Sequence, residues 1–143
     1  GSGVGTYVDD VSNESSSGGV FYYYIDALEG PGNTYSFADT SRSNMVMALH
    51  PPKLPVPNAF TPDGNGLNDL FLPKTTFISS ENYHFQVYNR WGQLLWQTTD
   101  KDEGWDGYVD GKLAPQGTYV YKVNFINSAG EEQQKQGTFI LKL

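Results

Sequence analysis

Apolar and polar residues alternate with a period of two along much of the chain, whereas a helical period is hard to find. The alternating runs are rich in Tyr, Phe, Val and Ile, and they are separated by turn-forming Gly, Pro, Asn and Ser. This pattern predicts an all-β protein with hairpin connections. The spacing of the runs favours an immunoglobulin-like antiparallel β-sandwich, and an up-and-down barrel is the alternative that the pattern leaves open.

The clearest predicted hairpin surrounds the turn NRWG at residues 89–92. Phe85 and Val87 point toward one face before this turn, and Leu94 and Trp96 resume the alternation after it. Because the connection is short, the two strands are expected to be antiparallel neighbours.

Two further turns frame the last strands. A tight turn with positive φ is predicted at Asp110 and Gly111, and a second turn at residues 115–117 precedes a long strand. Tyr119 starts that long strand just after the turn, which is the position of the tyrosine corner in such sandwiches. The residues of the long strand and of the final strand that are predicted to face inward are Tyr119, Tyr121, Val123, Phe125, Phe139 and Leu141.

A proline-rich segment divides the chain. Residues 51–57, PPKLPVP, hold four prolines in seven positions, so they predict a stiff linker or an edge segment and not an interior strand. We therefore predict three units, 1–50, a linker at 51–56, and 57–143. The first unit is shorter than the roughly 100 residues of an independent sandwich, so it is predicted to be the last strands of a truncated upstream domain.

Within the first unit, two runs are typical of strands, at residues 20–30 and 43–50. A connection rich in Gly, Pro, Asn and Ser joins them. The residues that should share one face of the first run are Phe21, Tyr23, Ile25 and Ala27.

Charge and composition narrow the classes of partner. The formal net charge is −7 and the isoelectric point is about 4.6, which argues against nucleic acid or an anionic membrane. The chain has no cysteine, which excludes disulfides, thiol catalysis and Cys-ligated zinc. No apolar run approaches the roughly 20 residues of a membrane-spanning helix, so the chain is not expected to cross a membrane.

The stretch PNAFTPDGNGLNDLF, residues 57–71, is the most distinctive loop. Pro, Gly, Asn and Asp dominate it, and Phe60 and Phe71 frame it as hydrophobic anchors. Such a loop could hold a metal, hold a catalytic carboxylate, or serve as a structural and recognition feature.

Asp63, Asn65 and Asp69 are the calcium candidates of this loop. They stand at positions 1, 3 and 7 of an oxygen-rich arrangement that Ca²⁺ favours. Asn68 replaces the Gly of an EF-hand loop, and Lys74 replaces its bidentate Glu. The favoured interpretation is that the Asx side chains cap their own backbone in consecutive turns, so no metal or other cofactor is assigned.

Catalytic groups are sparse. His50 and His84 belong to different predicted units, and no nucleophile elbow accompanies them. Glu131 and Glu132 are adjacent beside a turn, which is typical of a solvated hairpin end. The sequence therefore predicts that the chain is not an enzyme.

Two aromatic pairs have more than one interpretation. Arg90 beside Trp91 could form a cation–π contact, pack across the hairpin, or stack on a ligand. For Trp105 and Asp106, the favoured interpretation is a tryptophan buried in the core and an aspartate that caps a turn. The alternative is that Trp91, Trp96 or Trp105 is exposed and serves as a platform for a ligand.

The order of four motifs carries a resemblance. PNAFTPDGNGLNDLF, YNRWGQLLWQT, WDGYVDGKLAPQGTYVYKV and GTFILKL together resemble the type B C-terminal sorting domain of the type IX secretion system, the gliding motility-associated C-terminal domain, over residues 57–143. Family members usually read PNGDG where this chain has PDGNG. The upstream strands resemble the end of a fibronectin type III-like repeat.

The resemblance implies a non-catalytic secretion signal and surface-attachment domain on an exported cell-surface protein, expected to be a large gliding adhesin. Its expected partners are the type IX translocon and an outer-membrane accessory barrel of the PorP/SprF kind. The residues expected to take part in recognition are Phe60, Asp63, Asn65, Asn68, Asp69, Arg90, Trp91, Trp105 and Asp106. The alternative function is carbohydrate or other ligand binding by an adhesin β-sandwich, through its exposed tryptophans.

Overall fold

The computed structural model describes residues 18–28 and 40–143, and within these ranges it holds strands and turns but no helix. Accordingly, the described part of the chain contains no helix that could span a membrane. Parts of the predicted upstream unit, residues 1–17 and 29–39, lie outside the described residues. The predicted all-β fold class is confirmed.

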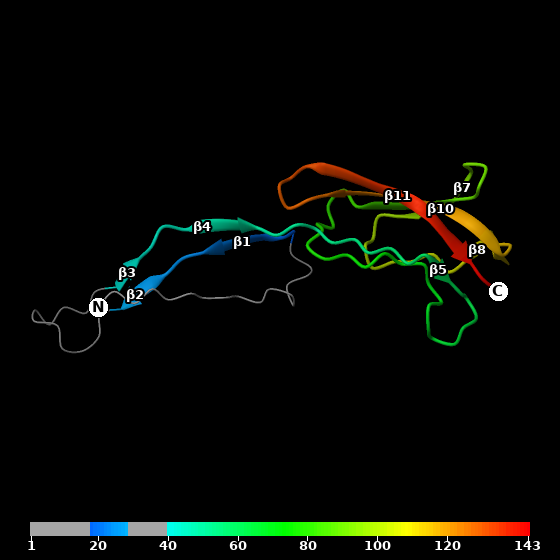
Figure 1. The fold of residues 1–143 in the computed structure, drawn as a ribbon, viewed down its shortest axis with the longest axis horizontal. Helices are drawn as coiled ribbons and strands as arrows, with labels where there is room; N and C mark the ends of the chain where they lie inside the picture. The colour runs from blue at the N-terminus through cyan, green and yellow to red at the C-terminus, as the bar shows by residue number, and fades with distance from the viewer. Residues whose placement is uncertain (1–17, 29–39) are drawn as a thin grey trace, which may run out of the picture.

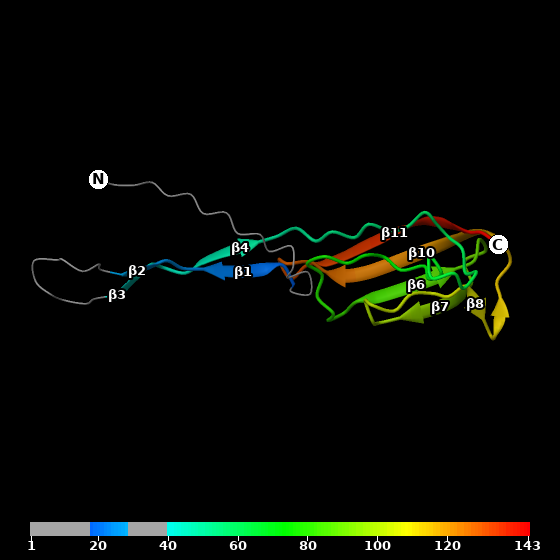
Figure 2. The same cartoon turned by 90° about the horizontal axis from the view of Figure 1, so that it is seen from below.

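A five-stranded sheet forms the centre of the protein (Figures 1 and 2). Its strands in spatial order are β5 (Ala59–Phe60), β11 (Glu132–Leu141), β10 (Gly117–Ile126), β6 (His84–Tyr88) and β7 (Leu94–Thr98). All neighbours are antiparallel except β5 and β11, which are parallel. Hairpins impose antiparallel pairing only on consecutive strands, and β5 and β11 stand at opposite ends of the domain sequence.

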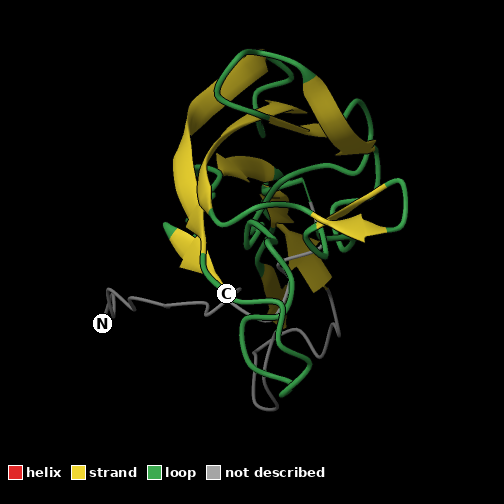
Figure 3. Ribbon diagram, turned by 90° about the vertical axis from the view of Figure 1, so that its right-hand side faces the viewer, coloured by secondary structure: helices red, strands yellow, loops and turns green. Residues whose placement is uncertain are grey.

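One face of this sheet carries the core. From Tyr119 onward, the side chains of β10 alternate between buried and partly exposed, as the period-two pattern predicts. All six residues predicted to face inward on the last two strands are buried: Tyr119, Tyr121, Val123, Phe125, Phe139 and Leu141. Extended segments around Leu54, Phe71 and Trp105 cover this face as the second layer. Figure 3 shows the strands curving around loop segments.

The hairpin of β6 and β7 departs from the predicted alternation. Phe85 and Val87 are fully buried as predicted, and Trp96 packs partly against the core. The prediction for Leu94 is wrong, because its side chain is 43% exposed while Leu95 packs against the core. The register shifts at Val87 and Tyr88, where a β-bulge inserts an additional residue into β7 and reverses the side-chain alternation.

The predicted turns are present. Strands β8 (Tyr108–Val109) and β9 (Lys112–Leu113) pair across Asp110 and Gly111, whose φ angles are 51° and 76°. The Tyr119 hydroxyl donates to the carbonyl oxygen of Pro115 at 2.6 Å, as expected of a tyrosine corner. This bond fixes the turn that leads into β10.

The described upstream strands form a narrow ribbon that extends from one end of the five-stranded sheet (Figure 1). It consists of two antiparallel pairs, β1 (Val20–Tyr23) with β4 (Val46–Leu49), and β2 (Asp26–Leu28) with β3 (Thr40–Arg42). The predicted continuous face through Ile25 is wrong, because the strand is interrupted there and Ile25 is 73% exposed. The Ser43 hydroxyl accepts the Ile25 N–H at 2.7 Å and replaces a ladder bond.

The proline-rich segment lies along the domain as an edge segment. Lys53 and Thr76 exchange two backbone hydrogen bonds of 2.9 Å, and the Leu54 side chain is buried in the core. Lys135 Nζ also donates to the Leu54 carbonyl oxygen at 2.8 Å. The segment is thus held against the domain by these contacts, and the predicted division of the chain at residues 51–56 stays a prediction.

An aromatic cluster joins the ribbon to the domain. The rings of Phe21, His50 and Phe77 have centroids 5.0 to 5.8 Å apart. The Ser128 hydroxyl donates to the His50 carbonyl oxygen at 2.7 Å. His50 therefore has a structural position at this junction.

Candidate functional site

The loop between β5 and Phe71 is organised around one carboxylate. Asp69 accepts the Gly64 N–H at 2.7 Å and the Gly66 N–H at 2.6 Å, one on each oxygen. These hydrogen bonds, that from Gly66 above all, hold the pKa of Asp69 below its usual value by stabilising the charged form. Although this loop is exposed, the two hydrogen bonds give its backbone a defined shape.

Consecutive Asx turns shape the rest of this loop. Asp63 Oδ1 accepts the Asn65 N–H at 3.1 Å, and Asn65 Oδ1 accepts the Leu67 N–H at 2.8 Å. Asn68 has a φ of 55°, and its carbonyl oxygen accepts the Thr61 N–H at 3.0 Å. This is the Asx-turn arrangement that the sequence favoured.

The calcium candidates use their oxygens within the loop. Both oxygens of Asp69 accept backbone N–H groups, and Asp63 Oδ2 accepts the Asn65 side-chain amide at 2.9 Å. Across the described ranges, no three side chains of His, Asp or Glu gather as a candidate metal cluster. Calcium binding by this loop stays a hypothesis.

Both aromatic anchors of the loop are buried. Phe60 is 2% exposed and lies against Phe71 and Trp105, with ring centroids 5.8 and 5.7 Å away. Phe71 is fully buried and stacks on Phe139. Gly107 packs closely against the start of the loop. A Cβ at this position would lie only 3.1 Å from Cγ of Pro62, so the close packing requires a glycine.

Trp105 and Asp106 have the structural positions that the sequence favoured. Trp105 is fully buried, its indole N–H donates to the Tyr108 carbonyl oxygen at 2.9 Å, and its backbone forms a bridge with Phe71. Asp106 Oδ1 accepts the Tyr108 N–H at 2.9 Å and thus caps the turn. In the folded state, Phe60 and Trp105 can influence a partner only by fixing the surface above them; their part in recognition stays a prediction.

Arg90 and Trp91 stand at the turn between β6 and β7. The Arg90 guanidinium carbon lies 4.4 Å from the centroid of the Trp91 ring, so the predicted cation–π pair is present. Trp91 is 76% exposed, and Asn89 fixes its backbone by accepting the N–H groups of Trp91 and Gln93 at 3.0 Å each. The turn therefore presents an exposed aromatic ring on a rigid backbone.

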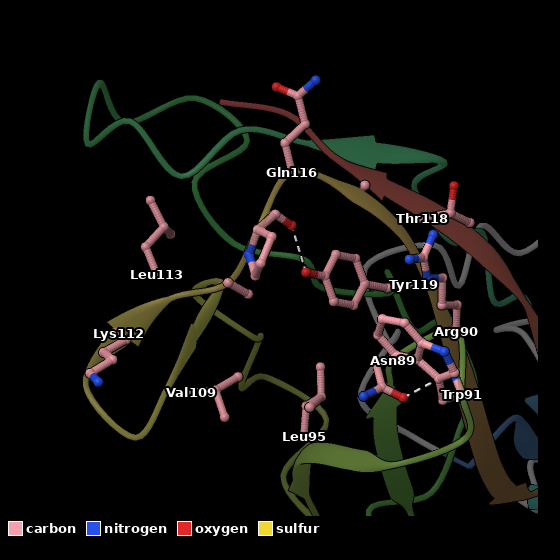
Figure 4. Close-up of a pocket in the computed structure, with 13 residues that line it drawn as sticks. Asn89, Arg90, Trp91, Leu95, Val109, Lys112, Leu113, Gln116, Thr118 and Tyr119 are labelled. Atoms are coloured by element: carbon pink, nitrogen blue, oxygen red, sulfur yellow. Dashed lines mark hydrogen bonds between the residues drawn. The ribbon is translucent and has the colours of Figure 1, made fainter.

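A groove of about 460 Å³ opens beside this turn (Figure 4). Arg90 and Trp91 lie on one side of it, and Val109, Lys112 and Leu113 of the β8–β9 hairpin lie on the other. These hairpin residues were not predicted as part of a site, although they belong to the motif WDGYVDGKLAPQGTYVYKV. Their assignment depends on the placement of two turns distant in sequence.

Two of the sequence-predicted regions gather at one end of the domain. Figure 1 shows that the loop after β5 and the turn before β7 both lie at the end far from the upstream ribbon. Trp105 joins the loop through its ring contact with Phe60, whereas Arg90 and Trp91 belong to the groove.

Comparison with known proteins identifies the domain. A family model described as CHU_C Type IX secretion signal domain matches residues 54–141. The chain belongs to this family. The matched residues include the five-stranded sheet, the Asx-turn loop and the groove, so the predicted type IX sorting domain is confirmed. No curated protein matches the chain. A type IX secretion signal domain interacts with the type IX secretion system and directs export.

Proposed function

We propose that this domain exports a large gliding adhesin through the type IX translocon and then attaches it to the cell surface. It acts by being recognised and carries out no catalysis. The observation that carries the proposal is the family match over 54–141, which includes both regions at the free end of the domain. A rigid loop and turn support recognition, because a partner does not have to order them on binding.

The positions of the candidate catalytic groups support a non-catalytic role. His50 packs between Phe21 and Phe77 at the junction, whereas the His84 ring bonds the Gln97 side chain on the main sheet at 3.1 Å. The Glu131 carboxylate accepts the Asn127 amide within a hairpin turn at 3.0 Å. These groups are held in separate places by structural contacts.

The proposed direct partners are the translocon and an outer-membrane accessory barrel of the PorP/SprF kind. To test this, the complete chain is fused to the C-terminus of a reporter and expressed in a host with the system, with or without the barrel. We expect the reporter outside the cell and attached to it when the barrel is present. Without the barrel, it should remain in the periplasm; periplasmic retention in both hosts contradicts the proposal.

A second candidate function is carbohydrate binding, which the 76% exposure of Trp91 favours. Exposed aromatic rings can stack on sugars, but Trp105 is buried and Trp96 packs edge-on against Phe85 with centroids 5.5 Å apart. A glycan array separates the two functions. Saturable binding by the wild type that is lost in Trp91→Ala, with folding retained, would favour this candidate.

A further inference from the structure

The groove has a charge opposite to that of the whole protein. The chain holds nine Lys and Arg against sixteen Asp and Glu, yet Arg90 and Lys112 line the groove and none of its described lining residues is acidic. Opposite charge on a partner would be attracted here, while the acidic remainder of the surface repels it. The charge pattern therefore selects an acidic ligand at this position.

The walls of the groove are largely apolar. Leu95 and Val109 pack partly against the core and also line the groove, and Leu113 stands beside them with 38% of its surface exposed. The Tyr119 hydroxyl is already used by the Pro115 carbonyl oxygen, so this side chain contributes mainly its ring. Such walls gain free energy by covering an apolar side chain of a ligand.

The turn at the rim has the chemistry of a protein-binding hot spot. Trp and Arg are enriched among the residues that dominate binding energy at protein interfaces. Trp91 and Arg90 provide both, already in mutual contact, and Asn89 fixes the backbone that carries them. Little ordering is then required when a partner binds.

We propose that this groove binds an extended peptide segment of the partner protein, with acidic side chains facing Arg90 and Lys112 on opposite sides of the groove and an apolar side chain between Trp91 and Leu113. The inference rests on the proposed function, because a secretion signal has a protein partner. A peptide is favoured over a nucleic acid because the net charge of the chain is −7.

The direct test is selection from a library of short random peptides on the complete folded chain. We expect enrichment of peptides that place Asp or Glu near an aromatic or aliphatic residue. Binding should weaken about tenfold or more in Trp91→Ala and in Arg90→Gln, and also in Lys112→Gln. It should also weaken as salt is raised, since the charges at the rim are screened.

Lys122→Gln provides the matched control. It removes one positive charge from the middle of β10, where Lys122 pairs with Gln86 and Gln136 outside the groove. This variant should bind the selected peptides like the wild type. Selection of neutral or basic peptides would overturn the inference, and so would an equal loss of peptide affinity in Lys122→Gln. Glycan binding through Trp91 would also overturn it.

Export of the reporter fusion separates this inference from the proposed function. If the wild type and Lys122→Gln are exported while the folded double variant Arg90→Gln, Lys112→Gln is retained, the groove is the docking site. If all three are exported equally, the groove inference is wrong and the proposed function stands. If the wild type itself is not exported, the proposed function fails, and the inference that rests on it fails as well.

Discussion

The rings of Phe71 and Phe139 stack with centroids 3.6 Å apart and planes 10° from parallel. Phe71 closes the Asx-turn loop, and Phe139 lies on β11, so one aromatic contact joins this loop to the centre of the core. Truncating either ring removes buried apolar surface and leaves a cavity.

Phe139→Ala is expected to lower the free energy of unfolding by about 3–5 kcal/mol. Chemical denaturation of the complete chain measures this. Ile140→Ala is the control on the neighbouring position of the same strand, where the side chain is 43% exposed and its truncation should cost much less. Equal losses in the two variants would show that the stacked pair does not organise the core.

Gly107→Ala should destabilise the fold more than Gly111→Ala. Both glycines have positive φ, 83° and 76°, so both variants strain the backbone. Only at Gly107 does the new Cβ also meet packed neighbours, 3.3 Å from Cδ1 of Leu141 and 3.4 Å from Cζ of Phe60, whereas Gly111 has open space. Overpacking should add about 1–3 kcal/mol to the loss of unfolding free energy, and equal denaturation midpoints would contradict this.

Tyr119→Phe and Tyr83→Phe should change stability in different directions. Tyr119→Phe removes the hydrogen bond to Pro115 and should cost about 0.5–1.5 kcal/mol. Among the described residues, the buried Tyr83 hydroxyl has no hydrogen-bond partner, and burial raises its pKa, so its removal should be neutral or stabilising. Thermal and chemical denaturation of both variants test the contrast; a large loss in Tyr83→Phe would reveal a bond to this hydroxyl.

Asp69→Ala is expected to lower the melting temperature by several degrees, because two backbone N–H groups lose their acceptor. Glu132→Ala, which removes an exposed carboxylate at the start of β11, is the control and should have little effect. Calcium and a chelator should leave the melting temperature of the wild type unchanged. A rise with calcium that Asp63→Ala abolishes would instead assign a metal site to the loop.

The contribution of Asp69 should also depend on pH. Its pKa in the folded state lies below the usual 3.8, so the unfolded chain takes up the proton first as the pH falls. The contribution is therefore complete above about pH 4 and is lost as the pH falls through the folded-state pKa. The difference in stability between the wild type and Asp69→Ala should shrink in that range, and a constant difference would contradict the ionic role.

Local chemistry in the sequence predicted much of this structure, because turns and strand faces depend on nearby residues. Asp110 and Gly111 favour a tight turn between two short strands, and the position of Tyr119 after its turn predicts its hydrogen bond. Leu94 was assigned to the wrong face, since a bulge depends on how β7 aligns with its partner. The alternation of apolar and polar residues predicts which side chains share a face of a strand, but it does not predict how that strand aligns with its neighbours.

The sequence likewise predicted one part of the candidate site and not the other. The Asx turns of the loop follow from the spacing of Asp63, Asn65 and Asp69, and the resemblance carried by the motif order named the family. The groove did not follow, because Trp91 and Lys112 line it from two separate hairpins whose relative placement depends on the tertiary fold. The sequence favoured a buried Trp105 and a hydrophobic anchor at Phe60, and both side chains are buried.

The parallel pairing of β5 with β11 gives the domain an order of completion. The Ile140 N–H donates to the Asn58 carbonyl oxygen at 2.9 Å, and the Lys142 N–H donates to that of Phe60 at 3.0 Å. The anchor of the loop thus finds its strand partner only after synthesis has reached β11. A chain truncated before β11 would lack this partner for β5, so a machinery that recognises the loop in its finished shape would reject truncated cargo.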